Sequence, residues 1–202
     1  MNFEENYPIL KSTDLVQLTE DFGSPLYVYH AETIKRQYER LTKAFSSVSL
    51  KVKYACKALT NIQVLKYIHG LGAGLDVVSI EEALIGIKAG FSPKEIHFTP
   101  NGVAFEEIKQ AVELGLVINI DNISVLEQFG HEYGNRIPCC IRLNPHIAAG
   151  GNSHIQTGHI DSKFGISVHQ LRHVLRIVNS NKMKVNGPVS YTHLTLPTSD
   201  LG

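Results

Sequence analysis

The amino-acid sequence predicts an α/β protein of the (β/α)8 barrel type, incomplete because only part of the barrel is present. From about residue 50, short β-branched or apolar runs alternate with segments of helical period, which is typical of parallel strands joined by crossover helices. The centres of these runs recur roughly every 22 residues, a spacing suited to one strand-helix unit. Polar groups follow strand after strand, as they do on the loops that carry the chemistry of barrels.

The segment before the repeats predicts one strand and one helix. Apolar side chains of residues 26–29 indicate a short strand. Ile34, Tyr38, Leu41 and Phe45 fall on one face of a helix. This helix would precede the first repeat.

Five strands are predicted within the repeats, at residues 52–55, 75–78, 96–99, 117–120 and 138–143, and a sixth near Val185. Their spacing alone allows either a closed barrel or an open doubly wound sheet. The polar groups at the strand ends favour the barrel; they are Lys57, Asp76, Asn101, Asp121, Arg142 and Asn144. Closure needs eight strands, so we expect the sequence to supply five to six of the eight units.

The helices between the strands have recognisable ends. Asn61 is placed to cap a helix that ends at Gly70. Ser79 and Glu82 form a capping box for a helix that Gly90 would terminate. Ser167 and Gln170 predict a second capping box further along the chain.

The last segment breaks the rhythm of the repeats. Residues 188–202, PVSYTHLTLPTSDLG, have neither a helical period nor a clear strand pattern. They resemble translated adaptor sequence, so we interpret them as a non-native tail; a native polar tail is the alternative. The predicted organisation is therefore an N-terminal segment at residues 1–30, a partial barrel at residues 31–187, and this tail at residues 188–202.

Composition excludes several classes of partner. The chain of 202 residues has 19 basic and 19 acidic side chains, so no broad positive surface is expected for nucleic acid. No basic segment followed by an apolar one opens the sequence, and no run approaches the ~20 apolar residues that span a bilayer. We therefore expect a cytoplasmic protein without a membrane partner. The odd number of cysteines, 3, indicates free thiols.

Lys57 is the residue with the clearest chemical potential. It comes just after a predicted strand, beside Tyr54, Ala55 and Ala58, where we expect it to be partly buried at the mouth of the barrel. Burial of an amine favours its neutral, nucleophilic form, which forms Schiff bases with aldehydes. Spacing alone leaves open an ordinary surface lysine.

Four segments, in order, resemble the fold-type III decarboxylases that use pyridoxal 5'-phosphate (PLP). KYACKALTN is similar to the family's Y-A-x-K-A-N segment, and GAGLDVVSIEEA to its G-x-D-x-x-S-x-x-E segment. IRLNP resembles R-x-N-P, and TGHIDSKFGI resembles S-K-F-G. The resemblance implies a PLP-binding barrel like that of alanine racemase, carried here by residues 31–187.

The same resemblance implies roles for individual residues. Lys57 would form the Schiff base with the cofactor, while Asp76 and Arg142 would lie in the polar layer near the cofactor and that lysine. The alternative for Asp76 and Arg142 is an interior ion pair that only orders the strands. Residues 162–165 match the family's loop motif, and a loop that staples the barrel mouth is as good an interpretation as substrate contact.

The implied function is that of a carboxy-lyase. The form I-x-T-G-x-x-x-S-K-F-G is most similar to family members that convert meso-2,6-diaminopimelate to L-lysine in lysine biosynthesis, as homodimers. The family's ring-facing histidine, glycine-rich phosphate site, pyridine-nitrogen acid and carboxy-terminal β-domain are not recognisable here, and His193 does not fit the histidine motif. The strand at 26–29 would join that missing domain. We therefore expect this chain by itself to be inactive.

Other interpretations stay open at this point. Related decarboxylases act on ornithine, arginine or carboxynorspermidine, and a regulatory PLP-binding barrel would share Lys57. A metal- or NAD-dependent α/β protein would leave Lys57 as ordinary surface. His146, His154 and His159 match no zinc spacing, so we predict no metal site. The G-x-G at residues 70–76 precedes a strand, whereas a dinucleotide motif follows one.

Overall fold

The computed structural model describes residues 15–147 and 164–190. The strands are β1 (Lys53–Ala55), β2 (Gly74–Val77), β3 (Ile96–Phe98), β4 (Val117–Ile120), β5 (Cys139–Asn144), β6 (Ile166–Ser167) and β7 (Val185–Val189). The α-helices are α2 (Leu15–Phe22), α3 (Ala31–Ala44), α4 (Ile62–Gly70), α5 (Ile80–Ala89), α6 (Phe105–Glu113), α7 (Ile123–Tyr133) and α8 (Leu171–Ser180). Short 3-10 turns are η2 (Cys56–Ala58), η3 (Pro93–Glu95) and η5 (Val168–Gln170).

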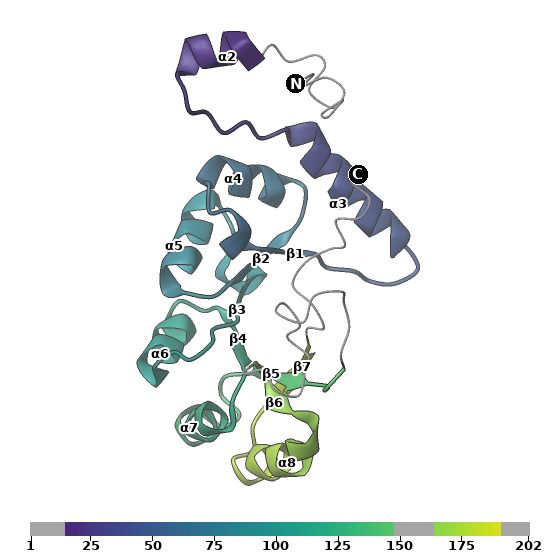
Figure 1. Ribbon diagram of the computed structural model, residues 1–202. Helices are drawn as coiled ribbons and strands as arrows, with labels where there is room; N and C mark the ends of the chain where they lie inside the picture. Colours follow the sequence, from purple (N-terminus) through teal and green to yellow (C-terminus); the bar gives the residue numbers. More distant parts are fainter. Residues whose placement is uncertain (1–14, 148–163, 191–202) are drawn as a thin grey trace.

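The strands form one parallel sheet in chain order, β1-β2-β3-β4-β5, with β6 and β7 both pairing β5. A doubly wound sheet reverses its strand order at a switch point, and this order does not reverse within β1 to β5. Helices α4 to α8 lie in an arc outside the strands (Figure 1). The described residues are therefore part of a βα barrel, as the sequence predicts.

One face of the sheet forms the hydrophobic core with the surrounding helices. Parallel register pairs Leu75 with Ile96 and Val77 with Phe98, and Phe98 in turn with Ile118. All five side chains are 0% exposed. Helix α5 lies directly against this face, because a Cβ added at its Gly86 would stand 2.5 Å from a methyl of Leu75. The side chains between these residues point to the opposite, inner face.

The predicted helix caps are present, with changes in detail. The Asn61 side chain accepts hydrogen bonds from the backbone N–H groups of residues 63 and 64. Ser79 accepts from the N–H of Glu82, and Gly90 ends α5 in the left-handed conformation. The Glu82 carboxylate bonds the N–H of Val78, one residue earlier than a capping box requires. Ser167 bonds the N–H of His169 and begins η5, while Gln170 makes no side-chain cap.

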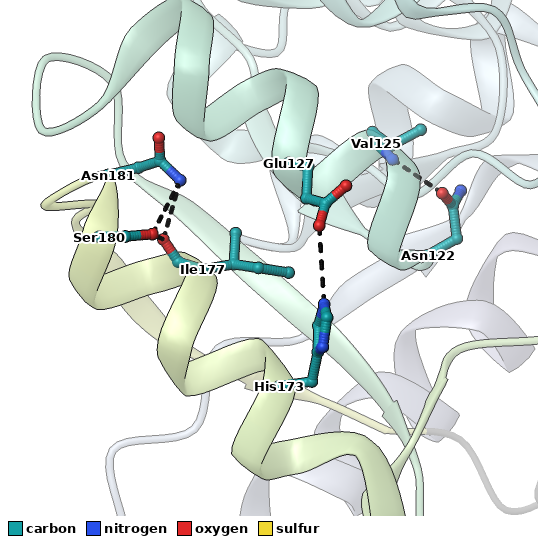
Figure 2. A network of polar contacts seen from close by, with 7 residues as sticks. All are labelled: Asn122, Val125, Glu127, His173, Ile177, Ser180 and Asn181. Atoms are coloured by element: carbon teal, nitrogen blue, oxygen red, sulfur yellow. Dashed lines mark hydrogen bonds and ion pairs between the residues drawn. The ribbon is translucent and has the colours of Figure 1, made fainter.

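Helices α7 and α8 pack side by side (Figure 2). Glu127 of α7 and His173 of α8 approach to 3.6 Å between Oε1 and Nε2. Gly130 of α7 lies against Asn181, where an added Cβ would meet the Asn181 side chain at 3.0 Å. The amide of Asn181 also donates to the carbonyl of Ile177, which closes the end of α8.

One predicted strand is absent, and one observed strand was not predicted. Residues 26–29 are not a strand: they pair with no strand in the described part of the chain, and Tyr27 is 84% exposed. A strand requires a neighbour to satisfy its backbone groups, so this apolar segment stays irregular here. The two-residue strand β6 was not predicted, because its pairing to β5 leaves no periodic signal.

The sixth predicted strand near Val185 is confirmed as β7. It runs through Pro188 and Val189 and pairs with Ile141 and Arg142 of β5. The strand thus enters the segment that the sequence assigns to a separate tail, of which residues 191–202 lie outside the described ranges. Among the described residues, no helix is both long and apolar enough to cross a bilayer.

Candidate active site

Lys57 stands on η2, immediately after β1. The neighbouring Cys56 is 0% exposed and anchors the turn in the core. The backbone N–H of Leu59 closes the turn by donating a hydrogen bond of 3.1 Å to the Cys56 carbonyl. Lys57 itself is exposed, so the predicted partial burial is wrong. In the described structure β1 pairs only with β2, so no strand covers its other side. The side chain of Lys57 is therefore accessible, while the backbone of the turn that carries it is fixed by Cys56 and Leu59.

The inner face of the sheet carries a layer of polar residues. Register pairs Asp76 with His97, His97 with Val117, and Asn119 with Cys140. Because side chains two residues apart share a face, the following residues point to the inner side. They are Asp76, Thr99, Asn119, Asp121, Cys140, Arg142 and Asn144. Asp121, Arg142 and Asn144, expected at strand ends, are all buried, whereas Asn101 is exposed.

Hydrogen bonds link three of these residues across three consecutive strands. The Thr99 hydroxyl donates to Asp76 Oδ1 at 2.6 Å. The Asn119 side-chain amide donates to the same hydroxyl oxygen, also at 2.6 Å. Thr99 and Asn119 are 4% and 2% exposed, so water does not compete for these bonds.

The structure brings the three residues predicted for the site into one electrostatic group. Burial raises the pKa of Asp76 above its ordinary value, and the Thr99 hydrogen bond and the charges of Lys57 and Arg142 act in the opposite direction. Both positive charges favour the ionised form of the carboxylate. Lys57 and Arg142 thus both act electrostatically on Asp76, and the roles of the three residues toward a cofactor stay a prediction.

Arg142 also interacts with a second buried carboxylate, Asp121. Burial raises the pKa of Asp121, while the Asn122 side chain, which donates to it at 3.1 Å, and the charge of Arg142 oppose that rise. The guanidinium carbon of Arg142 lies 4.8 Å from the ring centre of Phe164, a cation–π contact. The Arg142 guanidinium therefore acts electrostatically on two carboxylates and contacts an aromatic ring.

Gly165 explains how Phe164 reaches Arg142. Its φ is +79°, and a Cβ there would stand 3.1 Å from the Asn144 nitrogen and 3.2 Å from the Arg142 carbonyl oxygen. Only glycine lets this segment lie directly against β5. The contact supports the interpretation of a loop that staples the barrel; Ser162 and Lys163 lie outside the described residues.

His146 lies at the same end of the sheet, beyond β5. Its Nε2 is 2.7 Å from the Ser167 hydroxyl, and its backbone N–H donates to the side chain of Asn144 at 3.0 Å. Its Nδ1 is buried without a hydrogen-bond partner in the described structure. The other two histidines considered as metal ligands, His154 and His159, fall outside the described residues.

Sequence reasoning did not single out Thr99 and Asn119. A signal was present for Asn119, which is the one polar side chain in the strand segment VINI, where an inner-facing amide interrupts a buried run. Thr99 carried no such signal, because threonine is common at any strand end.

The fold and this site together define a βα-barrel protein with an accessible lysine after its first sheet strand and a buried, charged inner layer. Residues 31–193 match the family model described as the pyridoxal binding domain of pyridoxal-dependent decarboxylases. The chain belongs to this family.

Comparison with curated proteins gives relatives named diaminopimelate decarboxylase. The chain is 34% identical over 176 residues to the diaminopimelate decarboxylase of Methanothermobacter thermautotrophicus, covering 86% of the chain and 41% of the relative. It is 36% identical over 162 residues to that of Bacillus subtilis, covering 77% and 37%. The chain thus spans less than half the length of these relatives.

Solved structures agree with these relatives. Diaminopimelate decarboxylase from Helicobacter pylori, complexed with L-lysine, superposes with a TM-score of 0.82 at 26% identity, covering 91% of this chain and 48% of that one. The enzyme from M. jannaschii, in co-complex with L-lysine, gives 0.78 at 30% identity, covering 91% and 45%.

The described residues fit the cofactor that the family uses, pyridoxal phosphate. An accessible lysine amine suits its aldehyde, and a guanidinium within the polar layer suits its negative charge. The side-chain oxygen of Asn119 is buried without a partner in the described structure, a costly state that is typical of functional polar layers. Lys57, Asp76 and Arg142 are the residues we expect nearest to the cofactor.

Proposed function

We propose that this chain is the cofactor-binding part of an enzyme that decarboxylates meso-2,6-diaminopimelate to L-lysine. The names of the relatives support this substrate, and so do the lysine complexes of the similar structures. The observation that carries the proposal is the exposed Lys57, whose charge acts, together with that of Arg142, on the carboxylate of Asp76.

In this proposal each residue has a distinct task. Lys57 would hold the cofactor through its side-chain amine. Bound pyridoxal phosphate supplies a ring that takes up the electrons released when carbon dioxide leaves. Asp76 favours the protonated form of nearby amines, and Arg142 offsets the negative charge that gathers in the polar layer.

Because the chain spans less than half of its relatives, we assign the activity to the protein in which this segment is joined to the remaining parts, and we expect the chain alone to be inactive. We further propose a homodimer in the cytoplasm.

The test is covalent trapping of the cofactor. After incubation with pyridoxal phosphate and reduction with borohydride, mass spectrometry of peptides should place the label on Lys57. Lys57→Ala should abolish this label, whereas Lys66→Ala, which removes an exposed lysine of α4, should leave it unchanged.

Equal labelling of Lys57 and the exposed lysines would overturn the role of Lys57. Substrate identity needs a panel of meso-diaminopimelate, ornithine, arginine and carboxynorspermidine, with release of carbon dioxide as the readout from the longer protein. Preference for any of the last three would overturn the proposed substrate.

A further inference from the structure

We propose that Thr99 and Asn119 are positioning residues that keep Asp76 ionised beside Lys57. The proposal deepens the function proposed above and rests on it, because the charge of Asp76 matters to the reaction only if Lys57 holds the cofactor. It adds two residues to the site that act through the carboxylate.

The hydrogen bonds have one consistent direction. An ionised carboxylate only accepts, so the single hydroxyl proton of Thr99 must point to Asp76. The oxygen of Thr99 is then free to accept, and the Asn119 amide nitrogen donates to it. Donation by Asn119 keeps the Thr99 proton committed to the carboxylate.

The unpartnered oxygen of Asn119 supports this direction. If the amide were turned over, its oxygen would face the oxygen of Thr99 and compete with Asp76 for the hydroxyl proton. The observed orientation instead leaves Asn119 Oδ1 buried and without a partner in the described structure, which is unfavourable in itself. The arrangement therefore preserves the donor to Asp76 at the expense of the amide.

The chain of bonds also fixes Asp76 in space. Asp76 belongs to β2, Thr99 follows β3 and Asn119 belongs to β4, so the carboxylate is tied to two neighbouring strands. The backbone N–H of Thr99 bonds the carbonyl of Val77 at 2.8 Å, which extends the β2–β3 ladder to this point. Small movements of the carboxylate relative to the sheet are therefore resisted.

Several charged or titratable groups act on Asp76 or lie next to it in the sheet. Lys57 on η2 and Arg142 on β5 favour its ionised form, and Glu82 on α5 opposes it. Lys53 on β1 also interacts with Asp76, and His97 on β3 is its register partner. Burial favours the neutral acid, and Thr99 is the first of the influences that oppose burial.

The experiment is a pH titration of Asp76 in the cofactor-free protein, by NMR of aspartate residues labelled with 13C at the side-chain carboxyl. Asp76→Asn identifies the resonance. Thr99→Val should raise the titration midpoint by about one pH unit, the effect expected for losing one hydrogen bond to a charged group. Thr99→Ser should restore the midpoint, and Thr60→Val, at an exposed threonine, should not change it.

Asn119→Leu should raise the midpoint in the same direction by a smaller amount. Since Asn119 acts through Thr99, the double variant should match Thr99→Val alone rather than the sum of both shifts. An unchanged midpoint in Thr99→Val, or additive shifts, would overturn the proposal. If Thr99→Val does not fold, the Asn119→Leu titration decides the outcome by itself.

This titration needs neither cofactor nor substrate. Failure to trap the cofactor on Lys57 would therefore refute the proposed function without altering the Asp76 midpoints, and unchanged midpoints would refute the positioning role without altering the trapping.

Discussion

The two faces of strands β2 to β4 differ in what they contribute, although their residues alternate along the same strands. The outer face consists of apolar side chains that are fully buried against the helices, such as Leu75 and Phe98. The inner face has Asp76, Thr99 and Asn119, joined by hydrogen bonds and including one unsatisfied oxygen. The outer face stabilises the fold, and the inner face maintains a charge where burial disfavours it.

Phe98→Ala should have the largest effect on stability. It removes a fully buried ring from the outer face and leaves a cavity, which should lower the free energy of unfolding by about 3–5 kcal/mol. Denaturant unfolding followed by circular dichroism measures the change. Leu84→Ala, at a half-exposed position on α5, serves as the control and should cost far less. Similar losses in both variants would contradict the assignment of the core to the outer face.

The carboxyl groups of the inner face should make the stability of the protein depend on pH. The pKa values of Asp76 and Asp121 are raised above 3.8 in the folded state. Between pH 3.8 and these raised pKa values the folded protein therefore binds more protons than the unfolded chain. Their contribution to stability therefore falls as pH increases from about 3.8 through the raised values. The double variant Asp76→Asn, Asp121→Asn should lack this fall.

The measurement is the difference in unfolding free energy between the variant and the unmodified protein across that window. The difference should increase in favour of the variant with rising pH and then level off. A constant difference would mean that neither carboxyl has a raised pKa.

Asn119→Leu should have the smallest effect on stability. It removes a hydrogen bond of roughly 0.5–1.5 kcal/mol but also removes a buried unsatisfied oxygen that costs roughly 1–3 kcal/mol. The free energy of unfolding should stay within about 1 kcal/mol of the original value or increase. A loss of unfolding free energy as large as that of Phe98→Ala would show that the inner layer stabilises the fold as much as the core does.

Sequence patterns predicted the repeats well because the buried strands carry apolar residues on their outer face and several helices have a side-chain cap at their start. Val117–Ile120 was predicted to the residue, and Asn61 and Ser79 cap their helices as expected. These signals are local, so they can be interpreted without knowledge of the neighbouring elements.

The errors concern features that depend on distant partners. Residues 26–29 have strand composition, but a strand also needs a neighbour, which the described residues do not provide. The burial of Lys57 was overestimated for the same reason, since only β2 flanks β1. The residues near Asp76 were only partly identified: family motifs indicated Arg142, whereas Thr99 became recognisable only once strand register placed it beside the carboxylate.

The order of the strands has a consequence for how the site is made. Each strand from β2 to β5 pairs with the one that precedes it in the chain, so every new pairing closes a loop of only one repeat. During synthesis the ribosome releases Lys57 first, then Asp76, Thr99, Asn119 and finally Arg142. Lys57 and Asp76, which belong to the first two repeats, are the first of these residues available for pairing, and Arg142 is the last. The order of the repeats in the sheet is thus also the order in which their residues leave the ribosome.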